Sequence, residues 1–126
     1  MTEIRVLVID EITEMRLALA ALLNLETDMT ITEADSAHSG LHMAAKTCPD
    51  IIIIADTLDS LALTTELHRE CPTIRIIALA DRDDAGTCKL LRDAGASVCV
   101  PATVMDPQRL VDAIRRVHAE PSARSA

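Results

Sequence analysis

Two adjacent acidic residues, Asp10 and Glu11, directly follow an apolar run, IRVLVI, at residues 4–9. A strand of a parallel sheet is buried on both faces and therefore reads as a nearly continuous apolar run. Ligands of such sheets bind beyond the carboxyl ends of the strands. Two neighbouring carboxylates repel each other unless a cation or proton relieves them, and Mg²⁺ prefers oxygen ligands. The pair therefore predicts either a weak Mg²⁺ site or a solvated remnant of one, and Glu11 could instead stabilise the following helix through its dipole.

Thiols and imidazoles are the other side chains with chemical potential. The chain has four cysteines, at positions 48, 71, 88 and 99, with no CxxC or Cys/His ligand spacing. Because the N-terminus lacks the basic and apolar segments of a secretion signal, we interpret all four as reduced thiols that fill small apolar spaces. A thiol sensor centred on Cys99 is the alternative, although a buried thiol forms a thiolate poorly.

The histidines and one arginine group have simple interpretations. His38 and His42 are spaced i, i+4, which a metal would permit, but no third ligand is near in sequence and we expect both to face solvent. We expect His68 and His118 to be isolated and exposed. Arg109, Arg115 and Arg116 belong either to the polar face of the last helix or to salt bridges in a dimer built on it.

Length and composition indicate one globular domain. The chain has 126 residues, 49% hydrophobic and 25% charged, which is enough for a sizeable core. It contains no Phe, Tyr or Trp and carries a formal net charge of −8. Base stacking requires aromatic side chains and phosphate contacts require clustered Lys and Arg, so we expect no direct binding to nucleic acid. No stretch reaches the ~18 apolar residues of a membrane span, and we expect a cytoplasmic protein.

The elements that position these residues alternate along the chain. Apolar runs predict strands at 4–9, 29–33, 51–54, 74–79 and 98–100, with helical spacing between them. Short connections between alternating strands and helices favour an α/β fold with a doubly wound parallel sheet. We assign residues 1–119 to one domain and 120–126, a small polar stretch, to a disordered tail or the start of a linker to an output domain.

Each predicted helix has an apolar stripe and a recognisable end. Ser36, Asp59 or Ser60, and the pair Asp106-Pro107 are good helix starts, and Gly95 is typical of a left-handed helix stop. The stripes predict these buried residues: Met15, Leu19, Leu22 and Leu23; Leu41, Ala44 and Ala45; Leu63 and Leu67; Leu90, Leu91 and Ala94; Leu110, Ala113, Ile114 and Val117.

Several longer motifs together resemble the receiver domain of bacterial response regulators in two-component signalling. They are VLVIDE at 6–11, PDIIII at 49–54, PTIRIIALA at 72–80, LLRDAGAS at 90–97 and DPQRLVDAI at 106–114. The resemblance is strongest to receivers that precede helix-turn-helix output domains. It implies a flavodoxin-like (CheY-like) fold, with a five-stranded sheet in the order 2-1-3-4-5 and five helices.

The resemblance also implies a phosphorylation site, from which this sequence departs. Family members place an acceptor aspartate after the third strand, a hydroxyl after the fourth, and an aromatic and a lysine on and after the fifth, around a cation held by the acid pair. Here those positions hold Ala55, Ala80, Cys99 and Ala102. Asp56 lies one residue beyond the acceptor position, and such a shift turns a strand side chain to the opposite face.

These departures predict an atypical receiver, or pseudo-receiver, that is not an enzyme and requires no cofactor. We expect a phosphorylation-independent homodimerisation and interaction module that regulates an output domain or transcription-factor partner. Its interface is expected on the fourth and fifth helices, the first helix or the edge of the fifth strand. The alternative is a phosphorylatable receiver that uses Asp56 as a shifted acceptor, with Mg²⁺ held by Asp10 and Glu11.

Overall fold

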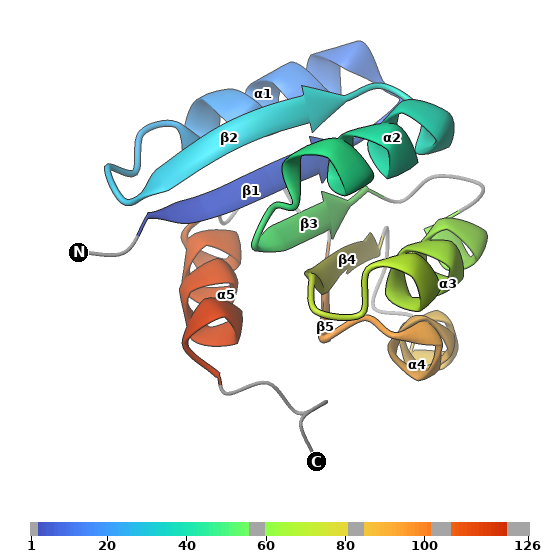
Figure 1. Ribbon diagram of the computed structural model, residues 1–126. Helices are drawn as coiled ribbons and strands as arrows, with labels where there is room; N and C mark the ends of the chain where they lie inside the picture. The colour runs from blue at the N-terminus through green and yellow to red at the C-terminus, as the bar shows by residue number, and fades with distance from the viewer. Residues whose placement is uncertain (1–2, 56–59, 81–84, 102–106, 121–126) are drawn as a thin grey trace.

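Strands and helices alternate regularly through the computed structural model, which describes residues 3–55, 60–80, 85–101 and 107–120. All strand pairs are parallel, in the order β2-β1-β3-β4-β5, and the helices cover both faces of the sheet (Figure 1). The elements are β1 (Ile4–Ile9), α1 (Thr13–Leu23), β2 (Met29–Ala34), α2 (Ala37–Thr47), β3 (Ile51–Ile54), α3 (Ser60–Glu70), β4 (Arg75–Ala80), α4 (Ala85–Ala94), β5 (Val98–Pro101) and α5 (Pro107–Ala119). The predicted doubly wound sheet and its strand order are confirmed.

The sheet separates two apolar clusters. On one face, Ile51 and Ile53 of β3 pack in the cluster that contains residues of α1 and α5. On the other face, Ile52 and Ile54 pack with residues of α2, α3 and α4. All four isoleucines are 0% exposed, which explains why this strand is a continuous apolar run rather than an alternating one.

Two of the predicted capping signals, Ser36 and Gly95, are confirmed. Ser36 begins α2 with a capping box, in which its side chain accepts a hydrogen bond from the Ser39 N–H and the Ser39 side chain accepts one from the Ser36 N–H. Gly95 follows α4 with a φ of +128°, a conformation that glycine adopts without a steric penalty. Asp59 and Asp106 lie outside the described residues.

The rotation of α1 differs from the predicted stripe. Met15 is exposed and Leu22 is half-buried, whereas Ala20 and Leu23 are buried. Arg16 lies on the inner side instead, because its guanidinium donates to the backbone carbonyl of Asp10, which follows β1, and to the carboxylate of Glu33 in β2. The prediction that Met15 is buried is therefore wrong.

The predicted burial of four further residues is also wrong. Leu90 of α4 is 56% exposed, and Ala45 of α2 is exposed. In each helix an adjacent member of the predicted stripe is buried, Leu91 in α4 and Ala44 in α2, because the face that packs against the sheet is narrower than the predicted stripe. His68 and His118 are half-buried rather than exposed, whereas His38 and His42 are exposed as predicted.

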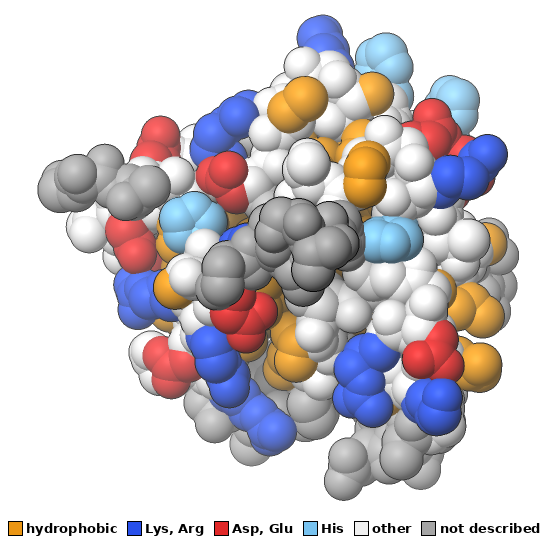
Figure 2. Space-filling view, turned by 60° about the horizontal axis from the view of Figure 1, so that its bottom comes forward, with side chains coloured by type: hydrophobic (Ala, Val, Ile, Leu, Met, Phe, Trp, Pro, Cys, Tyr) orange, Lys and Arg blue, Asp and Glu red, His pale blue; other side chains and the backbone are white. Residues whose placement is uncertain are grey.

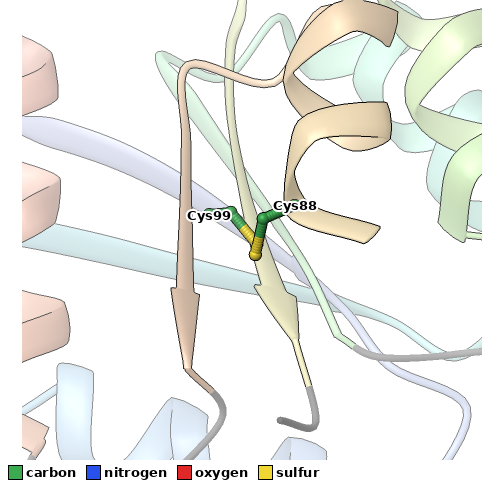
Figure 3. The surroundings of a disulfide bond; sticks show 2 residues. All are labelled: Cys88 and Cys99. Carbon is green, nitrogen blue, oxygen red and sulfur yellow. A yellow bond between two sulfur atoms is a disulfide. The ribbon is translucent and has the colours of Figure 1, made fainter. Parts of the chain in front are cut away.

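The interpretation of all four cysteines as reduced thiols is wrong for two of them. Cys88 of α4 and Cys99 of β5 form a disulfide, with a Cα–Cα distance of 5.6 Å (Figure 3). The chain reverses direction between α4 and β5, and packing of the helix against the strand brings these positions together. Cys48 and Cys71 are free thiols.

Of the helices in the described part of the chain, none is long and apolar enough to cross a membrane.

Candidate functional site

Asp10 and Ala55 lie beside each other at the carboxyl edge of the sheet. Ile9 of β1 pairs with Ile54 of β3, and the Ala55 N–H donates to the Ile9 carbonyl at 3.0 Å. Asp10 and Ala55 therefore continue adjacent parallel strands by one residue each. Ala80 ends β4, the next strand along the same edge. The structure thus brings Asp10, Ala55 and Ala80 to one end of the sheet, as the resemblance implied.

The carboxylate of Asp10 is buried and engaged in the local backbone. The residue is 5% exposed, and its Oδ1 accepts a hydrogen bond from the Ile12 N–H at 2.9 Å. This bond shapes the turn that leads into α1, since an aspartate commonly bonds the backbone two residues further on. Asp10 therefore has a structural function in this chain that does not require a metal.

Arg16 is the charged residue at this edge that the sequence reasoning missed. Its Nη1 donates to the Asp10 carbonyl at 3.0 Å, and its Nε donates to Glu33 Oε1 of β2 at 3.2 Å. Its side chain is only 13% exposed. The sequence does contain a signal for this role, because Arg16 is a cation near the start of the helix that follows the acid pair. Arg16 supplies positive charge close to this acid pair from within the protein.

The described residues do not fit a magnesium site of the kind the family resemblance implies. Glu11 is exposed, Asp10 is bound to the backbone, and the neighbouring position on β3 is an alanine. Within residues 3–55, 60–80, 85–101 and 107–120, no group of three or more His, Cys, Asp or Glu side chains could hold a metal ion. Mg²⁺ is usually bound by carboxylates from several positions. Here Ala55 occupies one of those positions and supplies a methyl group instead of an oxygen.

The remaining predicted positions carry small or bonded side chains. Ala55 and Ala80 are buried, and as alanines their side chains carry no oxygen for a phosphoryl group. Cys99 is half-buried and joined to Cys88. Asp56 and Ala102 lie outside the described residues.

A hollow of about 530 Å³ lies at the opposite edge, where β3 and β4 begin. Its lining includes the two free thiols, Cys48 and Cys71, together with Arg75 and His118. Arg75 donates to the carbonyls of Val117 and His118, at 2.7 and 2.9 Å, and so holds the end of α5. Burial raises the pKa of the Cys71 thiol, and the neighbouring Cys48 adds to the effect. This hollow is therefore remote from the edge that carries Asp10.

Charged side chains of both signs are interspersed on the surface of the molecule that Figure 2 shows, with small apolar areas between them. Such mixing is typical of a solvated protein surface. Across the whole chain Asp and Glu number 20 against 12 Lys and Arg.

Comparison with known proteins supports the observed fold. Residues 6–115 match the family model of the response regulator receiver domain. The transcriptional regulatory protein LiaR of Bacillus subtilis (strain 168) is 32% identical over 97 residues, which make up 74% of this chain and 46% of LiaR. The chain thus spans about half the length of that relative.

Solved structures share the same architecture at lower identity. A two-component response regulator of the LuxR family from Aurantimonas sp. SI85-9A1 superposes with a TM-score of 0.86 at 23% identity, covering 94% of this chain and 86% of its own. The response regulator domain of Thermotoga maritima CheB gives a TM-score of 0.83 at 21% identity, covering 94% and 99% respectively. The strand order, the edge that carries Asp10 and the match over residues 6–115 lead to one conclusion: this chain belongs to the response regulator receiver domain family.

Proposed function

We propose that this receiver domain works without phosphorylation, as an interaction and dimerisation module that regulates a transcriptional output. The observation that carries the proposal is the placement of Ala55. It directly follows a fully buried strand, and its N–H donates to the carbonyl of Ile9, the last residue of β1 and the one before Asp10. This is the position beside the acid pair where a receiver would need a nucleophilic carboxylate.

The chemistry of phosphoryl transfer supports this reading. The acceptor must present an oxygen to phosphorus, and fixed positive charge must stabilise the oxygens of the transferred group. Ala55 has no such oxygen, and Ala80 has no hydroxyl to bind the product. Arg16, the cation that bonds to the Asp10 backbone carbonyl, is also bound to Glu33. In this proposal the domain is not an enzyme and requires no Mg²⁺ or other cofactor.

The output is proposed from the kind of relative that the chain resembles. LiaR is a transcriptional regulatory protein, and this chain matches less than half of its length. We propose that the partner is an output domain or a separate transcription factor in the cytoplasm. The domain itself would bind protein rather than nucleic acid, since its formal net charge of −8 opposes contact with phosphates.

Intact-mass spectrometry after incubation with a small phosphodonor and Mg²⁺ tests the proposal directly. The expected result is no phosphoryl mass increment on folded wild-type protein, while a receiver with an intact acceptor aspartate gains one in a parallel incubation. The variant Asp56→Ala is run beside the wild type. An increment that is present in the wild type and absent from Asp56→Ala would overturn the proposal and establish a shifted acceptor.

Light scattering of the purified chain tests the dimer. We expect a dimer whose dissociation constant is unaffected by phosphodonor and Mg²⁺. Exposed leucines and methionines lie on two of the predicted surfaces, with Leu90 at 56% exposed on α4 and Met15 at 41% on α1. The matched variants Leu90→Glu and Met15→Glu distinguish them, because a charge buried in an interface weakens it strongly and one on a free surface does not. A monomer at all concentrations would contradict the dimerisation part of the proposal.

A further inference from the structure

The attachment of α4 to the sheet is narrow. Among its residues whose side chains the structure describes, Leu91 is the buried one, at 2% exposed. Cys88 and Ala94 are half-buried, and Leu90 is 56% exposed. By contrast, α5 buries five residues, Leu110, Val111, Ala113, Ile114 and Val117. A helix with so little apolar burial is expected to move more readily than its neighbours.

A covalent bond supplements this narrow contact. Cys88 lies in the first turn of α4 and Cys99 in the middle of β5, and the two side chains point toward each other across the gap between helix and strand (Figure 3). Cys99 pairs in register with Ala78 of β4 and packs against the same cluster as Leu91. The bond therefore ties the helix to the edge strand on the face where Leu91 makes its contact.

Both sulfur-bearing residues are half-buried, so the bond is neither sealed in the core nor freely solvated. In a reduced protein one of the two thiols attacks a disulfide first, and we take Cys88 as that thiol. The second cysteine is already positioned to resolve the mixed disulfide, given the Cα–Cα distance of 5.6 Å.

We propose that Cys88 and Cys99 form a reversible redox switch that locks α4 to β5 when oxidised and releases the helix when reduced. The oxidant is a low-molecular-weight disulfide. The Cys88 thiolate attacks one of its sulfurs and releases one small thiol, and the Cys99 thiolate then attacks Cys88 Sγ and releases the second. The two electrons and the two protons lost by the cysteines leave with the two small thiols. Reduction by excess small thiol runs the same steps backwards.

The switch would change the surface that the domain presents. When α4 is released, Leu90 on its outer side no longer has a fixed position relative to β5 and α5. The consequence for dimerisation rests on the proposed function, which places α4 and β5 among the candidate interfaces. The redox reaction of Cys88 and Cys99 does not depend on the proposed function, and it is tested separately.

The redox couple is measured in the Cys48→Ser/Cys71→Ser variant, so that only the proposed pair can react. The folded protein is equilibrated with reduced and oxidised glutathione at a series of ratios. Its free thiols are then alkylated and counted by intact-mass spectrometry. We expect no alkylated thiol at oxidising ratios and two at reducing ratios, and the same curve when it is approached from either direction. Two alkylated thiols at every ratio, or none at every ratio, would overturn the proposal.

Hydrogen–deuterium exchange then tests the release of α4. On reduction we expect amides of residues 85–94 to exchange about tenfold faster, with α5 unchanged. Cys88→Ser and Cys99→Ser should each show the fast exchange in both buffers, with circular dichroism confirming that they fold. Equal α4 exchange in the oxidised and reduced wild type would overturn the switch. A phosphoryl increment in the mass experiment above would overturn the proposed function and leave these results unaffected.

Discussion

Arg115 and Asp28 form a two-point ion pair that holds α5 against the connection between α1 and β2. The arginine Nε donates to Asp28 Oδ2 and its Nη2 to Oδ1, each at 3.0 Å. The same Nη2 donates to Glu26 Oε1 at 2.6 Å. Arg115 therefore forms ion pairs within its own chain. Its participation in a salt bridge across a dimer stays a prediction.

This pair predicts a pH dependence of stability. The hydrogen bonds from Arg115 hold the pKa of the Asp28 carboxyl below its ordinary value of 3.8. A carboxyl whose pKa is lowered on folding stabilises the protein above its unfolded pKa, and that contribution is lost as the pH falls through the folded value. Arg115→Gln should therefore lower the urea midpoint at about pH 6 and leave it nearly unchanged at about pH 2.

The matched control for this measurement is Arg116→Gln, which removes the neighbouring exposed charge. Its urea midpoint should differ little from that of the wild type at both pH values. Equal losses for Arg115→Gln at both pH values would show that Asp28 does not carry the effect.

Restoring a carboxylate beside Asp10 should make the protein sensitive to Mg²⁺. In Ala55→Asp, two acidic side chains meet at a buried edge and repel, so we expect a loss of about 2 kcal/mol in the free energy of unfolding without metal. Millimolar Mg²⁺ should recover part of this loss and leave the wild type unaffected. Thermal unfolding with and without MgCl₂ measures both effects. Ala55→Asn serves as the uncharged control. If Mg²⁺ stabilised Ala55→Asn as much as Ala55→Asp, the prediction would be contradicted.

Thr64 offers an opportunity to stabilise the protein. It is 0% exposed, and its hydroxyl has no hydrogen-bond partner among the residues that the structure describes. Because burying an unpaired hydroxyl is costly, Thr64→Val should raise the free energy of unfolding by about 1 kcal/mol. The neighbouring Thr65 is exposed and donates to the Leu61 carbonyl at 2.9 Å, so Thr65→Val provides the control and should give no gain. Chemical denaturation of the two variants decides the matter.

Gly95 should tolerate no side chain. Its φ of +128° strains any other residue, and a Cβ would collide with the ring of His68. We expect Gly95→Ala to lower the free energy of unfolding by about 1–3 kcal/mol. The double variant Gly95→Ala/His68→Ala should recover only the part that comes from the collision, compared with His68→Ala alone. Full recovery in that cycle would show that the backbone conformation costs nothing.

The amino-acid sequence by itself determined the elements and their order. Buried strands such as Ile51–Ile54 are readable because parallel strands are apolar on both faces, and this one is 0% exposed throughout. Ser36 begins α2 and Gly95 follows the end of α4, and both signals are readable because each depends on only a few adjacent residues. The longer motifs, which carry the family resemblance, then placed Ala55 beside Asp10 at the edge of the sheet.

Only the tertiary structure decided how distant residues meet. The spacing of α1 cannot show that Arg16 rather than Met15 turns inward, because that depends on the Asp10 carbonyl and the Glu33 carboxylate that accept its hydrogen bonds. Cys88 and Cys99 carry no recognisable pairing signal, since their separation of 11 residues spans a helix end, a turn and a strand. Their proximity comes from the packing of α4 on β5, which is a property of the assembled sheet and of no local stretch of the chain.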